Sequence, residues 1–469
     1  MLVSTSVRKI RRWLGAPASC FVLVACLIGV AAALLNPAFG GYDEADHFLR
    51  AWQISEGELI ADVGPGAVGE PTHGSRQPAE LPRDIARLKF SSVGNPGEAG
   101  KAFEYLGASP PGGETMFIGF PATASYSPVA YMGAAGGIRI SRWLNLSTLA
   151  ALWAARLGGL GLYVAIIVRA MRHLPGSAWL IGALAVTPVG VLQAATVSAD
   201  GVTIALCLLA IAYSLRIVML DAASVVPRRL AIEGVLIATA LGLAKPPYVL
   251  LLLIMVPVFL RRGSPNGKSV YVAVWAAGCA AATAWNLYAR GVYTAPMRLS
   301  NVDSGRQLKF VALHIGEFVK AIVATVSDSG FRLGREMVWS TAAWIPPTWF
   351  LVVATSVIVG SLMFAGGTRT VGVQSVDGVT SRSLVLTTLC TTSLIGFFVF
   401  LFAYAGWNPV GASRVDEVQG RYLFPCVALV SLVVSRRNSR VAIGQVVPFC
   451  AIAAMSVFTV VGISVHYYI

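Results

Sequence analysis

The sequence predicts an all-α, polytopic membrane protein, and three observations support that fold class. Of the 469 residues, 56% are hydrophobic and 12% are charged, which is about half the charged share of a soluble domain. Apolar runs of about 20 residues, long enough to cross a bilayer as a helix, recur along the chain. Basic residues gather in alternate connections between these runs, which indicates regular crossing with the basic loops inside.

This alternation predicts about eleven transmembrane helices. They are expected near residues 16–35, 147–168, 178–197, 201–219, 230–244, 247–260, 270–288, 346–365, 384–404, 421–435 and 441–464. Residues 1–15 are expected to form a cytoplasmic basic tail, and residues 16–469 a single transmembrane domain. The amino end is then cytoplasmic and the carboxyl end external.

Two long loops are expected on the external face. The first, residues 36–126, follows the first span and holds twelve of the acidic residues. The second, residues 289–338, is expected to carry an amphipathic helix around Leu308–Val326. Residues 127–142 are expected to form an interfacial helix, because a full crossing there would place the basic end of the next span outside.

The formal net charge of +14 follows from this topology and does not indicate a nucleic-acid partner. The segments assigned to the inside hold 17 of the 36 Lys and Arg residues, but only Asp221, Glu233 and Asp377 of the 22 acidic residues. The excess of Arg over Lys, together with the high content of Ala, Gly and Val, indicates a GC-rich bacterial genome. We therefore expect a multi-pass protein of the bacterial inner (plasma) membrane, with membrane lipid as its surroundings and its active face external.

The stretch Tyr42–Arg50 is the strongest candidate site. Three carboxylates, one imidazole and one guanidinium fall within its nine residues, directly after the first span. Read as a helix, it places four polar side chains on one face, because positions three and four apart are neighbours: Asp43, Asp46, His47 and Arg50. The stretch is either a helix cap beside the membrane or an active-site carboxylate pair at the lipid interface.

Polar residues at other external helix ends also have two interpretations. Asp200 either caps the next helix or belongs to the site. Lys245 lies at a Pro-Pro break, where it either extends to the interface or faces a phosphate. Arg421 enters the membrane just before an apolar helix, where it either contacts headgroups or binds a phosphate bidentately.

A resemblance connects these short motifs, which occur in order along nearly the whole chain: Asp43-Glu44-x-x-His47-x-x-Arg50-Ala51, Ile54-Ser55-x-Gly57, Tyr126-Ser127-Pro128, Ser198-x-Asp200-Gly201, Lys245-Pro246 and Gln419-Gly420-Arg421-Tyr422. The combination resembles the bacterial "domain of unknown function 2142" predicted membrane proteins. That family is similar to the GT-C glycosyltransferases, multi-span enzymes that use polyprenyl-phosphate sugars. The resemblance implies a GT-C-like domain with Asp43 or Glu44 at the catalytic acid/base position.

Together these features predict a glycosyltransferase that moves a sugar from a polyprenyl-phosphate donor to an acceptor glycan, lipid or protein on the external face. Asp43 or Glu44 would deprotonate the acceptor hydroxyl, and Lys245 and Arg421 would stabilise the departing lipid phosphate. Six further residues are expected to orient the substrates: Asp46, His47, Arg50, Asp200, Gln419 and Tyr422.

The sequence leaves cofactors and other functions open. A divalent cation held by Asp43, Glu44 and His47 is an option, although such ions usually take more oxygen ligands than this motif offers. The alternative functions are a transporter or flippase for a lipid-linked glycan and a non-catalytic partner in cell-envelope assembly. The span interiors are nearly uncharged, with Arg156 the main exception, and no internal repeat is visible, which favours the enzyme over the transporter.

Overall fold

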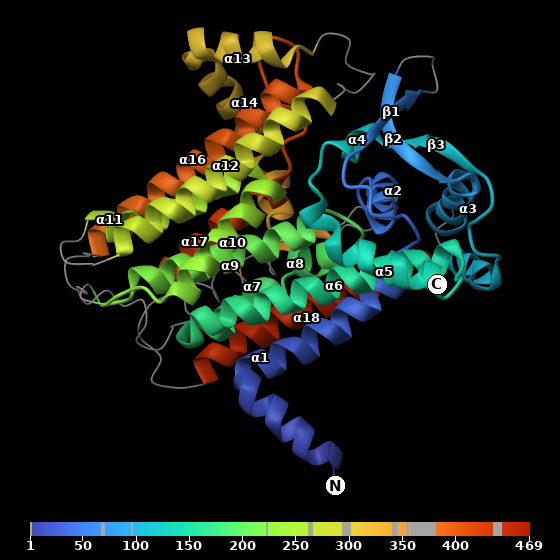
Figure 1. Cartoon of the computed structure of the whole chain (residues 1–469), viewed down its shortest axis with the longest axis horizontal. Helices are drawn as coiled ribbons and strands as arrows, with labels where there is room; N and C mark the ends of the chain where they lie inside the picture. Colours follow the sequence, from blue (N-terminus) through green and yellow to red (C-terminus); the bar gives the residue numbers. More distant parts are fainter. Residues whose placement is uncertain are drawn as a thin grey trace.

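The computed structural model describes residues 2–66, 71–94, 97–221, 224–260, 266–292, 302–339, 346–348, 350–352, 356, 381–434 and 443–469. Long helices form one bundle, and a small sheet with short helices is gathered at one end of it (Figure 1). The expected mostly helical, multi-pass membrane architecture is confirmed.

The described residues form α-helices, 3₁₀ helices and three strands. The α-helices are α1 (Leu2–Leu35), α2 (Glu44–Ser55), α3 (Leu81–Val93), α4 (Pro121–Ala124), α5 (Met132–Trp143), α6 (Thr148–His173), α7 (Ala178–Ala185), α8 (Pro188–Ala194), α9 (Asp200–Val218), α10 (Arg228–Ala244), α11 (Val256–Leu260), α12 (Gly267–Val292), α13 (Ser304–Leu313), α14 (Ile315–Glu336), α16 (Ser381–Trp407), α17 (Phe424–Val434) and α18 (Ile443–Tyr468). The 3₁₀ helices are η1 (Ala99–Gly107), η2 (Pro128–Tyr131), η3 (Pro175–Ser177), η4 (Pro246–Met255) and η5 (Gly420–Leu423), and the strands are β1 (Asp62–Pro65), β2 (Pro71–Pro78) and β3 (Thr115–Gly119).

Within the described ranges, six helices are long and apolar enough to cross a membrane, or up to eight spans if each of two bent helix pairs is one span. The six are Ala16–Leu35, Thr148–His173, Asp200–Val218, Gly267–Ala289, Arg382–Trp407 and Val446–Tyr468. The expected number of about eleven therefore stays a prediction. The span expected near 346–365 lies mostly outside the described residues, and the apolar helix Pro246–Phe259 is shorter than these six.

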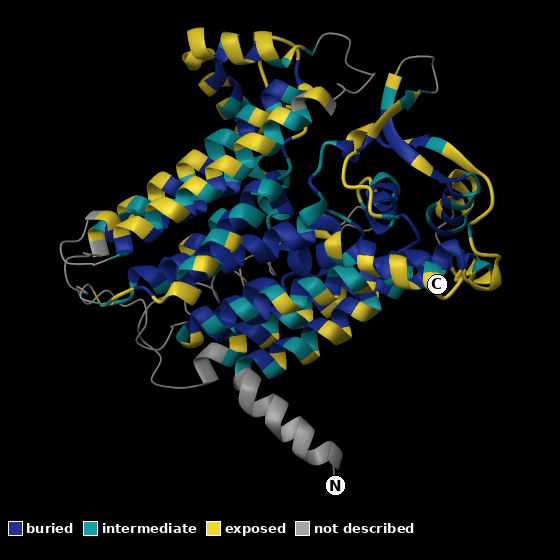
Figure 2. Ribbon diagram, viewed as in Figure 1, coloured by how far each residue is buried: buried dark blue, intermediate teal, exposed yellow. Residues whose placement is uncertain are grey.

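Helix α9 is the centre of the bundle. In its apolar window 94% of the residues are buried, against 17–44% in the other five long helices. Figure 2 shows the same contrast, with exposed residues along α12 and α16. Charged groups lie at both ends of α9: Asp200 begins it, and Arg216 near its last turn lies 3.3 Å from the imidazole Nδ1 of His173.

The segment 36–126 is more regular than expected, because it contains a three-stranded antiparallel sheet in the order β1-β2-β3. This corrects the purely all-α expectation. The sheet could not be predicted from the sequence, because β2 begins and ends with proline and lacks the alternation of apolar residues that is typical of a strand. At its centre, Gly74 leaves no room for a side chain, since a Cβ there would lie 2.0 Å from the Ile118 carbonyl oxygen of β3.

Helix α5 is a short helix packed tightly on α6, and the expected interfacial position of the segment 127–142 stays a prediction. Its 12 residues are too few for a span. The backbones approach closely because glycines face each other: a Cβ on Gly137 would lie 1.9 Å from the Ala154 carbonyl oxygen, and one on Gly158 2.1 Å from that of Gly133. Small residues allow such close helix contacts.

The segment 289–338 differs from expectation in one respect. The amphipathic helix expected around Leu308–Val326 is two helices, α13 and α14, which meet at His314 with a bend of 106°. Their outer surfaces carry exposed apolar side chains, among them Leu313 and Val323.

The carboxyl end of the chain lies against the segment 36–126 (Figure 1). The rings of Tyr468 and Phe103 stack with centroids 5.7 Å apart, and Ile463 and Tyr467 pack on Ala99. Both regions are therefore on the same side of the bundle, as the predicted topology requires.

Candidate functional site

The acidic stretch begins with a residue in an unusual backbone conformation. Asp43 precedes α2 with φ 49° and ψ 25°, the left-handed region, and makes no capping hydrogen bond with its side chain. The residue is exposed. Glu44 and Asp46 lie in the first turn of α2, where negative charge is favoured by the helix dipole. Asp43 therefore does not share one helix face with Asp46, His47 and Arg50 as expected, because it lies just before the helix.

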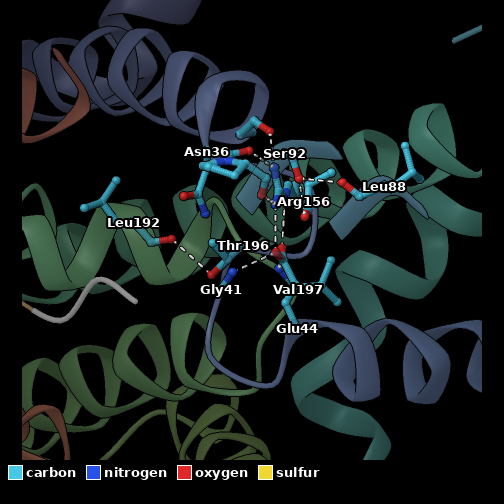
Figure 3. Close-up of polar contacts among 12 residues, drawn as sticks. Asn36, Gly41, Glu44, Leu88, Ser92, Arg156, Leu192, Thr196 and Val197 are labelled. Atoms are coloured by element: carbon cyan, nitrogen blue, oxygen red, sulfur yellow. Dashed lines mark hydrogen bonds and ion pairs between the residues drawn. The ribbon is translucent and has the colours of Figure 1, made fainter. Parts of the chain in front are cut away.

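Glu44 is fully buried in an ion pair with Arg156, which comes from the middle of α6 (Figure 3). Arg156 Nε donates to Glu44 Oε1 at 2.8 Å and Arg156 Nη2 donates to Oε2 at 2.7 Å. Both side chains are 0% exposed. The backbone N–H groups of Val197 and Gly41 donate to the same carboxylate at 2.9 and 3.1 Å.

The remaining N–H groups of Arg156 hold the backbone at the end of α1. They donate to the carbonyl oxygens of Ala33, Asn36 and Pro37 at 2.8–2.9 Å. The pair thus joins α1, α2 and α6 to the turn before α9. This geometry gives Glu44 a structural role, because its carboxylate is enclosed by protein donors rather than open to a substrate.

Asp46 has the chemistry expected of a group that exchanges protons near neutral pH. Burial and repulsion from Asp43 raise the pKa of its carboxyl to about 6, although Lys89 of α3 acts in the opposite direction. The backbone is fixed by the Thr123 hydroxyl, which donates to the Asp46 carbonyl at 2.9 Å. Asp43 and Asp46 form a pair of interacting carboxylates beside the bundle.

His47 is a neutral imidazole held by aromatic side chains. Burial lowers its pKa to about 4, although Asp200 and Asp43 act in the opposite direction. Its Nδ1 lies 2.6 Å from the hydroxyl of Tyr131, and its ring packs edge-on against Tyr126 with centroids 5.7 Å apart. His47 therefore connects α2 to the η2 region and lies near the Asp200 carboxylate.

Arg50 has a buried position that suits a structural role. Its side chain is 0% exposed, and Nη2 donates to the carbonyl oxygens of Leu59 and Tyr126 at 2.8 and 3.0 Å. Nη1 donates to the Gln53 amide oxygen. Arg50 thus joins α2 to two connecting segments, and the expected contact with substrate has no geometric support.

The two expected phosphate-binding cations converge on Asp200. Lys245 Nζ donates to Asp200 Oδ1 at 3.1 Å, and Arg421 Nε donates to Oδ2 at 2.7 Å. The three side chains retain some exposure, at 20%, 8% and 14% for Lys245, Arg421 and Asp200. Two cations and one anion give this triad, Asp200–Lys245–Arg421, a net positive charge.

Local breaks in the helices bring the triad together. Lys245 has extended backbone because Pro246 and Pro247 follow it and end α10. The Tyr422 ring lies beneath Lys245 Nζ, with 3.5 Å from the nitrogen to the ring centroid. Tyr422 is fixed in turn by Tyr248, whose hydroxyl donates to the Tyr422 carbonyl at 2.9 Å. The expected break at Lys245 is confirmed.

The triad and the acidic stretch form one site. The guanidinium carbon of Arg421 lies 4.6 Å from the ring centroid of Tyr42, the residue before Asp43. On the other side, the carboxylate of Asp200 influences His47. Residues from the start of α2, the start of α9, the end of α10 and η5 are thus assembled at one end of the bundle.

A cavity of about 690 Å³ opens beside this site, and Tyr42, Gln419 and Arg421 contribute to its wall. The rest of the wall comes mainly from α14 and the segment 407–417. Sequence reasoning missed the α14 residues, because nothing in their pattern distinguishes a cavity wall from an exposed helix face. It also missed the partner of Arg156, although an arginine inside an apolar span was a visible signal.

The described residues contain no group of three or more His, Cys, Asp or Glu side chains placed to hold a metal ion. The set Asp43, Glu44 and His47 does not meet that condition, because Glu44 is turned towards Arg156.

A family model described as "Predicted membrane protein (DUF2142)" matches residues 26–430. The matched range contains the acidic stretch, the triad and the whole wall of the cavity. No curated protein and no solved structure matches the chain.

Proposed function

The chain belongs to the DUF2142 family of predicted membrane proteins, and from this membership and the geometry of its site we propose that it is a membrane glycosyltransferase. The donor would be a sugar linked to polyprenyl phosphate, and the acceptor a glycan, lipid or protein on the external face of a bacterial inner membrane. One observation carries the proposal: paired carboxylates and a net-positive triad adjoin one another where several helices end on one side of the bundle. Glycosyl transfer from a lipid phosphate needs a base for the acceptor and positive charge for the leaving phosphate.

The reaction assigns one task to each group. An acceptor hydroxyl attacks the anomeric carbon, and its proton passes to Asp43, the exposed carboxylate beside Tyr42. The bond between the anomeric carbon and the phosphate oxygen breaks, and its electron pair leaves with the lipid phosphate. Lys245 and Arg421 then stabilise the phosphate charge, while Asp200 holds both cations in place.

Asp46 and His47 support this reaction from α2. When ionised, Asp46 attracts the proton that moves to Asp43, because the two carboxylates are close. His47 is neutral and keeps Tyr131 and Tyr126 packed against the helix. Glu44 is assigned to the buried pair with Arg156, so the proposal keeps Asp43 and not Glu44 as the base.

The test is transfer of a labelled sugar from polyprenyl phosphate to acceptors in membranes that contain the protein. Asp43→Asn should lower turnover per folded molecule about 10²–10⁴-fold, the cost of losing a general base. Glu56→Gln is the matched control, because Glu56 is an acidic residue just after the same helix, at the end opposite Asp43. Its carboxylate pairs with Arg142 at 2.9 Å. Full turnover by a variant with both Asp43→Asn and Asp46→Asn would remove this motif from the chemistry.

A further inference from the structure

The cavity beside the triad has a wall of mixed charge. Its charged lining residues are Asp328, Arg332 and Glu336 of α14, and Arg414, Asp416, Glu417 and Arg421 of the segment that precedes and begins η5. Trp407, the last residue of α16, and Tyr42 add aromatic surface. The volume of about 690 Å³ falls within the range of roughly 300–1,000 Å³ that is usual for small-ligand pockets.

Each cation of this wall already has an acidic partner. Arg414 pairs with Asp328 at 2.7 Å, Arg332 with Glu336 at 3.2 Å, and Arg421 with Asp200 at 2.7 Å. A strongly anionic ligand would also face Asp416 and Glu417. The wall therefore suits a neutral ligand rich in hydroxyl groups, which can donate to carboxylates and accept from guanidinium groups.

Hydrogen bonds to α14 and to Asn408 fix the segment 415–420. The Val415 N–H donates to the Thr325 hydroxyl at 2.8 Å, and the Gly420 N–H donates to Glu336 at 2.8 Å. The Asp416 N–H donates to Asn408 at 2.9 Å. Such fixed positions reduce the entropy lost on binding.

Two groups in this segment have conformations that suit a ligand. Glu417 is held with φ 60°, a left-handed conformation that costs a residue with a side chain about 1–3 kcal/mol and often occurs at functional sites. The amide oxygen of Gln419 is buried and accepts no hydrogen bond from any described residue. A buried acceptor of this kind is expected to have a donor when the site is filled.

We propose that this cavity binds a saccharide. One sugar ring packs on the indole of Trp407, which is 37% exposed, and its hydroxyls donate to Asp416, Glu417 and the amide oxygen of Gln419. Aromatic faces and carboxylates supply the contacts that a sugar ring needs, an apolar surface and hydroxyl acceptors. This inference deepens the proposed function, on which it rests, by giving the transferred or accepting sugar a place beside Arg421.

The test measures binding and needs no turnover. Purified protein in lipid nanodiscs is titrated with methyl glycosides of glucose, galactose, mannose and arabinose, with a polyprenyl-phosphate monosaccharide, and with polyprenyl phosphate alone. Ligand-observed NMR and tryptophan fluorescence report binding. Binding of a soluble glycoside identifies the cavity as the acceptor site, and binding of only the lipid-linked sugar, tighter than polyprenyl phosphate alone, identifies it as the donor-sugar site. Both results support a saccharide.

Two variants assign the binding to the cavity. Glu417→Gln and Trp407→Leu should each weaken saccharide binding about tenfold or more, the loss expected for one hydrogen bond to a charged group or one aromatic contact. Glu56→Gln, at the opposite end of α2 from Asp43, should bind as the unmodified protein does. Equal melting temperatures show that the variants are folded, and Gln419→Leu gives a second measurement at a different wall position.

The inference is overturned if none of these sugars binds, if all the cavity variants bind as tightly as the unmodified protein, or if polyprenyl phosphate binds as tightly without its sugar. Saccharide binding without any transfer would keep this inference and remove the proposed glycosyltransferase. Sugar transfer that the cavity variants do not change would keep the proposed glycosyltransferase and remove this inference.

Discussion

Glu44 and Arg156 lie 112 residues apart in sequence and form a buried ion pair in which both side chains are 0% exposed. Glu44→Gln should destabilise the protein by about 3–5 kcal/mol, because it leaves the Arg156 charge buried and unpaired. The melting temperature of the detergent-solubilised protein measures this loss.

The control for that prediction is Glu56→Gln, which breaks the partly exposed pair with Arg142. It should cost about 0–1 kcal/mol. If Glu44→Gln melts like the unmodified protein and loses only turnover, Glu44 belongs to the reaction and its assignment to a structural role is wrong.

The activity should depend on pH through Asp46. Its carboxyl has a pKa of about 6, so it is ionised above that pH and attracts the proton that moves to Asp43. We expect kcat/KM to fall as the pH decreases through about 6. Asp46→Asn should remove this acid limb and lower the rate at pH 7.5 on the order of tenfold, equivalent to about 1.4 kcal/mol. If the pH profile of the variant keeps its fall near pH 6, that fall belongs to the titration of another group.

The stability of the fold should also depend on Asp46, but it should fall as the pH rises, whereas the activity should increase. The pKa of Asp46 is raised from its ordinary value of 3.8 to about 6, so between these values the folded state binds more protons than the unfolded chain. The stability of the unmodified protein therefore falls as the pH rises from about 4 through about 6, and it levels off above about 6.5. Asp46→Asn should melt at a higher temperature than the unmodified protein at pH 7.

Melting curves at pH 4, 5, 6 and 7 check this prediction. The difference between the Asp46→Asn variant and the unmodified protein should be smallest at pH 4 and constant above about 6.5. A difference that does not change with pH would show that the carboxyl is not destabilised by its surroundings.

Topology can be tested by cysteine labelling in a variant that lacks the seven native cysteines. Gly94→Cys and Asp303→Cys should react from the external side, and Val225→Cys from the cytoplasmic side. Val225 is 61% exposed and lies between α9 and α10, at the end of α9 opposite Asp200. Labelling of all three positions by an impermeant reagent added to intact cells would contradict this orientation. Arg436, at the expected internal turn before the last span, lies outside the described residues.

The sequence predicted that Lys245 and Arg421 lie in one site at helix ends, but not how buried groups pair. Asp200, Lys245 and Arg421 could be placed on one face because each interrupts an apolar run at the same predicted side. The partner of Arg156 could not be predicted, because pairing between α2 and α6 depends on the angle at which the helices pack. For that reason Glu44 and Asp43, neighbours in one motif, could not be assigned different roles.

The missed sheet and the missed cavity have different causes. Strand β2 lacks alternation because Gly74 and the flanking prolines serve close packing and termination rather than a buried face. The cavity wall depends on the bend at His314, which turns α14 so that Thr325 accepts from the Val415 N–H. A local sequence pattern does not encode that long-range contact.

The packing of Tyr468 on Phe103 sets an order of events during biosynthesis. The segment that carries Asp43 is synthesised early, whereas α18, on which its η1 helix rests, is synthesised after every other described helix. Helix η1 can therefore complete its packing only after α18 has been inserted. Until then η1 lacks its final support, so premature termination before α18 leaves a protein in which the segment 36–126 is incompletely packed.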